Sequence, residues 1–192
     1  MSAVSIVILK SRLKIATMFL KESEATVLFP GGFGTFDEGF ESLTLVQTGK
    51  AKPRPIVAID PPGSSFWRST LKLFKRNFVD EKLVGPGDLG LIRHFQDTEK
   101  AADEITGFYR NYHSSRFFRD QYLVRMRRKL TDDQLGRLRR EFKDILAKGS
   151  FDRLLDAAQD DIKDSSLHRI VFYFNRAAYD RLRVLIDYLN NL

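Results

Sequence analysis

The sequence predicts an α/β fold, in which a partial parallel sheet with flanking helices is followed by a small α+β domain. Two short apolar runs, at 25–29 and 56–59, are each followed by turn residues and then by a pattern of helical spacing. That order is typical of parallel β–α–β units. Charge is the second observation, because residues 106–192 hold 18 Lys and Arg against 12 Asp and Glu, whereas residues 1–105 hold 14 against 13. This change in character predicts a boundary, and we expect domains at 1–112 and 113–192.

Apolar runs and turn signals set the expected elements of the first domain. Strands are expected within 4–9 and over 25–29, 56–59 and 91–95, and helices over 11–22, 36–48, 66–78 and 98–109. Gly49-Lys50 is the stop signal of the second of these helices. Trp67, the only tryptophan, lies on an apolar helical face, so we expect it in the core rather than stacked on a base.

In the second domain we expect a strand, a helix, a second strand and a second helix, in this order, over 115–192. Its first helix opens on a capping box, Thr131-Asp132-Asp133-Gln134, and Gly149 is the expected stop signal. This helix should pack on a strand within 119–130 and cover its apolar side chains. A β-rich run at 167–174 and an amphipathic pattern from residue 179 complete the domain.

The stretch from Pro30 to Glu38 reads Pro-Gly-Gly-Phe-Gly-Thr-Phe-Asp-Glu and links the strand at 25–29 to a helix. Glycines let the backbone turn sharply and approach a ligand closely. A helix N-terminus favours an anion, through its free N–H groups and its dipole. Because Asp37 and Glu38 follow within about one turn, the pattern predicts a phosphate cradle with a carboxylate beside it. The alternative is structural, since Thr35 and Glu38 also have the spacing of a capping box.

These residues resemble the Pro-Gly-Gly-x-Gly-Thr-x-x-Glu signature of the LONELY GUY (LOG) family, and the similarity extends over about residues 17–110. The resemblance implies a Rossmann-like fold and hydrolysis of a nucleoside 5′-monophosphate to a free base and ribose 5-phosphate. It implies that Gly31, Gly32, Gly34 and Thr35 bind phosphate and ribose and that Glu38 is the catalytic acidic residue. It also implies a homodimer and no metal or redox cofactor. Members have often been labelled lysine decarboxylases, but nothing in the sequence marks a pyridoxal-phosphate site.

The sequence departs from the family pattern in two places. Family members carry an Arg-Lys pair about fifteen residues before the motif proline, and its arginine takes part in catalysis, whereas Ile15 and Ala16 stand there. Members also place several strands and a second glycine-rich loop upstream, so we expect a truncated member, a fragment or a displaced start. Both departures favour an alternative function, a non-catalytic nucleotide-binding or regulatory module.

The basic stretch Arg110–Lys129 contains seven Arg and Lys with interleaved aromatic residues and a single acid, Asp120. Such a composition can bind nucleic acid, or a nucleotide effector. We favour the structural interpretation, in which the arginines lie in water or pair with the acidic helix that follows. Binding of RNA or DNA is therefore a third function, and one that we do not expect.

Composition excludes several other classes. There is no cysteine, so disulfides and thiol chemistry are excluded. No apolar run approaches the ~18 residues of a transmembrane helix, and the run at 4–9 lacks the flanking signals of a secretory leader. We therefore expect a cytoplasmic protein without a membrane partner. His94 and His113 are isolated in sequence, which argues against a metal site.

Overall fold

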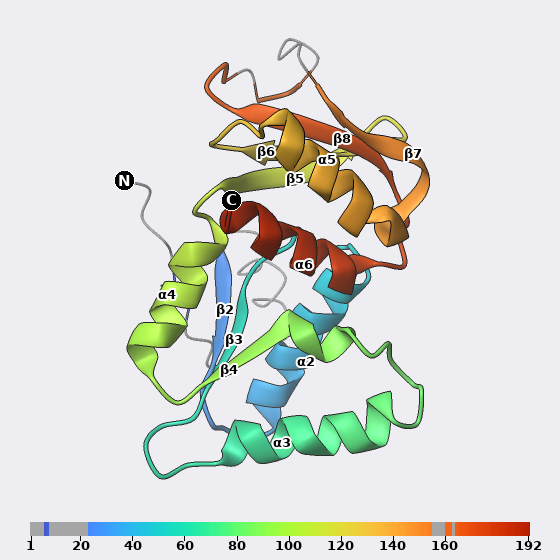
Figure 1. Ribbon diagram of the computed structural model, residues 1–192. Helices are drawn as coiled ribbons and strands as arrows, with labels where there is room; N and C mark the ends of the chain where they lie inside the picture. Colours follow the sequence, from blue (N-terminus) through green and yellow to red (C-terminus); the bar gives the residue numbers. More distant parts are fainter. Residues whose placement is uncertain (1–5, 8–22, 155–159, 163) are drawn as a thin grey trace. The chain divides into compact units, whose positions relative to one another are not determined.

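The computed structural model describes residues 6–7, 23–154, 160–162 and 164–192 (Figure 1). The chain forms two compact units, Met1–Gly107 and Phe108–Leu192. The first is built on a parallel sheet with helices and the second on an antiparallel sheet, so the predicted α/β fold class is confirmed. The helix expected over 11–22 lies outside the described residues.

The first unit is a parallel sheet with strand order β1-β2-β3-β4. Its register pairs Thr26 with Ile56 and Ile56 with Ile92. The elements along the chain are β1 (Ile6–Val7), β2 (Ala25–Leu28), α2 (Phe33–Gln47), β3 (Ile56–Ile59), α3 (Phe66–Phe74), β4 (Ile92–Phe95) and α4 (Thr98–Phe108). Short helical turns at Lys75–Val79 and Asp88–Leu91 precede β4.

Alternating side chains of the strands face the two helical layers. Ile56 and Ala58 of β3 share one apolar cluster with Trp67 of α3 and with Val46 of α2. Their neighbours Val57 and Ile59 pack in a second cluster with Ala101 and Ile105 of α4. Figure 1 accordingly shows α4 on the opposite side of the sheet from α2. Trp67 is 2% exposed, which confirms its predicted place in the core.

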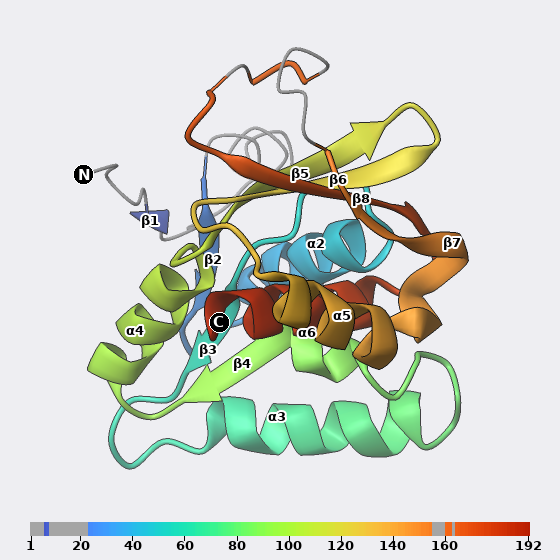
Figure 2. The ribbon, with the colours of Figure 1, turned by 45° about the horizontal axis from the view of Figure 1, so that its top comes forward.

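The second unit is an antiparallel sheet of order β5-β6-β8-β7, with helices packed on one of its faces (Figure 2). Its elements are β5 (Tyr112–Phe118), β6 (Gln121–Met126), α5 (Asp132–Glu141), β7 (Leu146–Arg153), β8 (His168–Phe174) and α6 (Tyr179–Asn190). Leu135 and Leu138 of α5 lie in one core with Val124 and Met126 of β6, as predicted for this helix and strand.

The predicted order of the second unit is wrong in two places. A hairpin of β5 and β6 replaces the single first strand. The helix that opens at Thr131 ends at Glu141 instead of continuing to Gly149, and Leu146–Arg153 is a strand. Gly149 has φ of 71° and lies where the β7–β8 ladder loses its regular register. This irregularity breaks the alternation by which a strand is recognised in sequence.

Among the described residues, no helix is both long enough and apolar enough to cross a membrane.

Candidate functional site

The glycine turn leads directly into α2, and the helix begins one turn earlier than a capping box at Thr35 would require. Gly32 is the N-cap, with extended backbone angles of φ −87° and ψ −157°. Its carbonyl oxygen accepts hydrogen bonds from the backbone N–H groups of Thr35 (3.0 Å) and Phe36 (3.3 Å). Thr35 is therefore the third helical residue, and the alternative that Thr35 and Glu38 cap this helix is wrong.

The three glycines of the turn meet different surroundings. A Cβ atom on Gly31 would lie 2.2 Å from Oγ1 and 3.0 Å from Cβ of Thr35, so any other residue there would force Thr35 to move. Apart from the neighbouring residues and the backbone of the helix itself, no described atom would lie within 4 Å of a Cβ atom on Gly32 or Gly34. A positive φ angle favours glycine, but neither Gly32 nor Gly34 has one. The described glycines with positive φ are Gly49, Gly63 and Gly149. Packing and backbone angles thus leave Gly32 and Gly34 unexplained, and open space lies beside their backbone.

Three helices begin where the parallel strands end, but only two of them have side-chain caps in the described structure. Asp60 accepts hydrogen bonds from the first-turn N–H groups of Trp67 (2.9 Å) and Arg68 (3.1 Å) in α3. Asp97 does the same for α4. No described side chain caps the N-terminus of α2, so within the described structure the N–H groups of Phe33 and Gly34 are left to an external anion.

Glu38 lies in the second turn of α2 and is only 8% exposed. Residues three and four apart share one face of a helix, so Glu38 lies one turn after Gly34 and Thr35 on the same face. Burial raises the pKa of Glu38 above its ordinary value, and the carboxylates of Glu41 and Asp37 raise it further. A carboxyl group whose pKa is moved toward neutrality is suited to proton transfer.

Asp60 joins β3, α3 and β4 at the same edge of the sheet. Besides the two helix N–H groups, its carboxylate binds Nε2 of His94 at 2.9 Å, and it is fully buried. Burial alone would raise the pKa of Asp60, but the N–H groups of Trp67 and Arg68 and the His94 ring together hold it below the ordinary value. His94, isolated in sequence, therefore has a carboxylate partner. This capping role of Asp60 was not anticipated from the sequence.

An open groove of about 410 Å³ lies at this edge, between the ends of β2, β3 and β4. It is lined by Phe29, Ile59, Asp60, Pro61, Pro62, Gln96, Asp97 and Thr98. Gln96 is held in place because its Oε1 accepts a hydrogen bond from Nη2 of Arg68 at 2.7 Å. Phe29 immediately precedes Pro30, so the groove adjoins the glycine turn. Ligands of open α/β sheets bind at this edge.

Comparison with protein families agrees with this geometry. The family described as "possible lysine decarboxylase" matches residues 3–105, more than half of the chain. The chain belongs to this family. This is the LOG family, and residues Pro30–Glu38 carry its signature. The match includes the glycine turn, α2 and the groove, and it ends before the second unit. No curated protein matches the chain.

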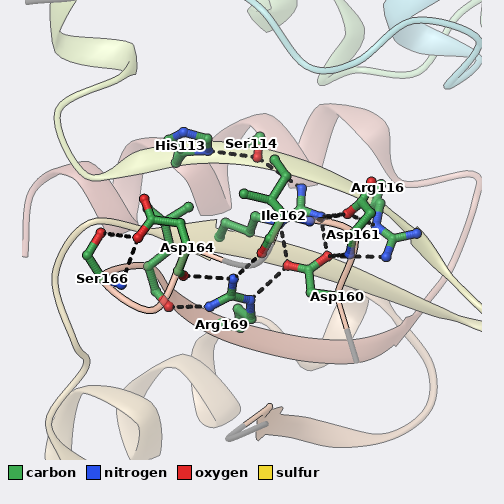
Figure 3. Close-up of polar contacts among 11 residues, drawn as sticks. His113, Ser114, Arg116, Asp160, Asp161, Ile162, Asp164, Ser166 and Arg169 are labelled. Carbon is green, nitrogen blue, oxygen red and sulfur yellow. Dashed lines mark hydrogen bonds and ion pairs between the residues drawn. The ribbon is translucent and has the colours of Figure 1, made fainter. Parts of the chain in front are cut away.

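The arginines of the basic stretch are arranged differently from the prediction. Arg125 of β6 and Arg169 of β8 lie directly opposite each other, a repulsive placement on neighbouring strands. The buried carboxylate of Asp160 lies between them, 2.6 Å from Nε of Arg125 and 2.8 Å from Nε of Arg169. Figure 3 shows Asp160 together with Arg116, whose Nη2 is 3.2 Å away.

The predicted pairing of these arginines with the acidic helix is therefore wrong for Arg116 and Arg125, which bind the loop that contains Asp160. The ion pair to α5 comes from β7 instead, where Nη1 of Arg153 lies 2.6 Å from Asp132. Arg169 also donates to backbone carbonyls of the loop, including that of Asp164 at 3.0 Å. The register of the sheet decides which cations this loop neutralises, and the register is not marked by any local motif in the sequence.

Proposed function

We propose that the glycine turn and α2 bind a nucleoside 5′-monophosphate and that the protein hydrolyses its N-glycosidic bond. In this reaction water adds across the bond: its hydroxyl goes to C1′ of the ribose and a proton goes to the departing base nitrogen. The observation that carries the proposal is the uncapped N-terminus of α2 beside the open backbone of Gly32 and Gly34, with buried Glu38 one turn further on.

Each group has a role that follows from its position. The backbone of Gly31, Gly32 and Gly34 and the side chain of Thr35 would hold the phosphate and ribose, where the helix dipole favours negative charge. Glu38 would orient the attacking water or stabilise the positive charge that develops on the sugar in the transition state. The groove beside Phe29 offers room for the remainder of a nucleotide.

The alternative is a module that binds a nucleotide without hydrolysing it. It is favoured by Ile15 and Ala16, which stand where family members carry the Arg-Lys pair. The two functions separate in one experiment on purified protein. Binding of AMP together with release of adenine supports hydrolysis, whereas binding without release supports the alternative.

Replacing Glu38 by Gln tests the assignment of the catalytic residue. Gln has nearly the same size but cannot carry the negative charge, so we expect adenine release to fall by ~10²-fold or more. Nucleotide binding, measured by calorimetry, should change little. The stability change should be at most about 1 kcal/mol, because Glu38 does not cap the helix. Equal rates of adenine release by the parent and Glu38→Gln would remove Glu38 from the mechanism.

A further inference from the structure

Phe33 is the most exposed of the large apolar side chains in the described structure, with 94% of its surface accessible. It differs in this from the phenylalanine three residues later, since Phe36 contacts the rings of Phe40, Phe66, Trp67 and Phe74. Core packing within the described chain thus gives no reason for an aromatic ring at position 33.

The ring of Phe33 lies close to the N-terminus of α2, because its backbone forms the start of that helix. Phe33 is the first residue of α2, so its own N–H is one of the groups left free at the helix N-terminus. Its two neighbours, Gly32 and Gly34, have no side chains and open space around them. A ligand anchored by an anionic group at these N–H groups therefore lies within one side-chain length of an unshielded aromatic face.

We propose that Phe33 stacks on the base of the nucleotide bound at the glycine turn and thereby selects nucleotides over ribose 5-phosphate. This inference rests on the proposed function. An aromatic ring binds any base through its face, so it favours ligands that carry a planar base without choosing strongly among bases. Once the glycosidic bond is broken, ribose 5-phosphate has lost this contact and leaves more readily than the substrate would.

Calorimetric titration of AMP and of ribose 5-phosphate into the full chain tests the proposal. Phe33→Ala should weaken AMP binding by about tenfold and change ribose 5-phosphate binding by less than about twofold, because the sugar phosphate does not use the ring. Phe33→Tyr, which keeps the aromatic face, should bind AMP as the parent does. Leu83→Ala is the matched control, since Leu83 is also highly exposed (72%) but lies far along the chain from the glycine turn.

A second readout uses Phe33→Trp as a fluorescent reporter. The natural Trp67 is buried, so the added indole should supply the exposed emission of this variant. AMP should quench that emission and ribose 5-phosphate should not, and the parent protein gives the Trp67 background.

The outcomes distinguish a failure of the proposed function from a failure of the proposed role of Phe33. A parent protein that binds neither ligand overturns both the proposed function and the role of Phe33. A parent that binds AMP, with Phe33→Ala binding it equally well, overturns the role of Phe33 alone. The same holds if Phe33→Ala weakens both ligands equally. It also holds if the substitution changes the molar mass in solution, which would assign the ring to a subunit interface.

Discussion

Gly31, Gly32 and Gly34 illustrate how neighbouring residues of one type serve different purposes. The side chain of Thr35 fills the space where Gly31 would carry a Cβ atom. The other two glycines leave space that no described atom of the chain occupies. Packing therefore accounts for the first glycine, and the proposed ligand accounts for the others.

Alanine substitutions should separate these purposes. Gly31→Ala should lower the free energy of unfolding by about 1–3 kcal/mol, because the added methyl group collides with Thr35. Gly34→Ala should leave the free energy of unfolding unchanged or raise it by up to about 1 kcal/mol, because alanine favours a helix. The same variant should bind AMP more weakly than the parent. Denaturant unfolding and calorimetry measure the two effects, and undiminished AMP binding by Gly34→Ala would contradict a phosphate site there.

The residues of this candidate site were proposed from the sequence, but their local roles could not all be assigned. The motif identified Glu38 and the glycines, yet the spacing of Thr35 and Glu38 fits a capping box equally well. The decision depended on which carbonyl accepts the first helical hydrogen bond, and the structure places this bond at Gly32. Asp60 and its partner His94 are distant in sequence, and only the pairing of β3 with β4 brings them together.

At the scale of elements, the carboxylate of Asp160 connects the loop at 160–162 to three strands of the second sheet, β5, β6 and β8. Asp160 bridges Arg125 and Arg169, which would otherwise repel each other on adjacent strands. Removing one member of a buried ionic group leaves charges without compensation, and this costs more than the intact group contributes.

Asp160→Asn should therefore lower the free energy of unfolding by about 3–5 kcal/mol. Asp161→Asn is the matched control from the same loop, and its effect should be smaller because the Asp161 side chain is 60% exposed. Equal effects of the two substitutions in denaturant unfolding would contradict the central position of Asp160.

The same carboxylate predicts a dependence of stability on pH. The hydrogen bond from Arg125 is the main reason why the pKa of Asp160 lies well below its usual range. Burial acts in the opposite direction, and the hydrogen bond from Arg169 lowers the pKa further. A carboxyl group with a lowered pKa in the folded state stabilises the fold above the pKa that it has when unfolded, about 3.9. That contribution is lost as the pH falls below this value. Unfolding measured between pH 7 and pH 3 should show a steeper loss for the parent than for Asp160→Asn.

Elements of the second unit could be predicted where the signal is local. The capping box at Thr131 is present in both directions, since its Oγ1 accepts from the Gln134 N–H and Gln134 accepts from the Thr131 N–H. The end of that helix was predicted wrongly because Ile145 and Leu146 continue its apolar spacing. Gly149 suits a helix end and an irregular strand equally well, and only strand pairing distinguishes the two.

At the scale of the whole molecule, we expect a homodimer. Phe40 of α2 and Leu73 of α3 are exposed by 39% and 46%, and Phe40 contacts Phe74 with ring centroids 5.3 Å apart. Large apolar side chains left exposed on packed neighbouring helices are typical of contact sites. Light scattering should give twice the chain mass of 22.2 kDa, and Leu73→Asp should shift this toward the monomer. A monomer at tens of micromolar parent protein would contradict the dimer.

The sequence predicted the first unit more fully than the second. Each strand and the helix after it have a local signal in the sequence, which is an apolar run followed by a turn and then by residues at helical spacing. Successive strands connected through a helix are expected to pair in parallel, and they do so in the order β1-β2-β3-β4. In the second unit β8 lies between β6 and β7, and such an order follows from side-chain packing between distant segments. No motif in the sequence marks it.

The difference between the capped helix α3 and the uncapped helix α2 should also be visible in amide hydrogen exchange. First-turn amides of a helix usually exchange quickly with solvent, but those of Trp67 and Arg68 in α3 donate to the fixed carboxylate of Asp60. We expect deuterium to replace these two protons slowly and the protons of Phe33 and Gly34 in α2 quickly. Adding AMP should slow exchange at Phe33 and Gly34 while leaving Trp67 and Arg68 unchanged. Fast exchange at all four amides with and without AMP would contradict both the Asp60 cap and the anion site on α2.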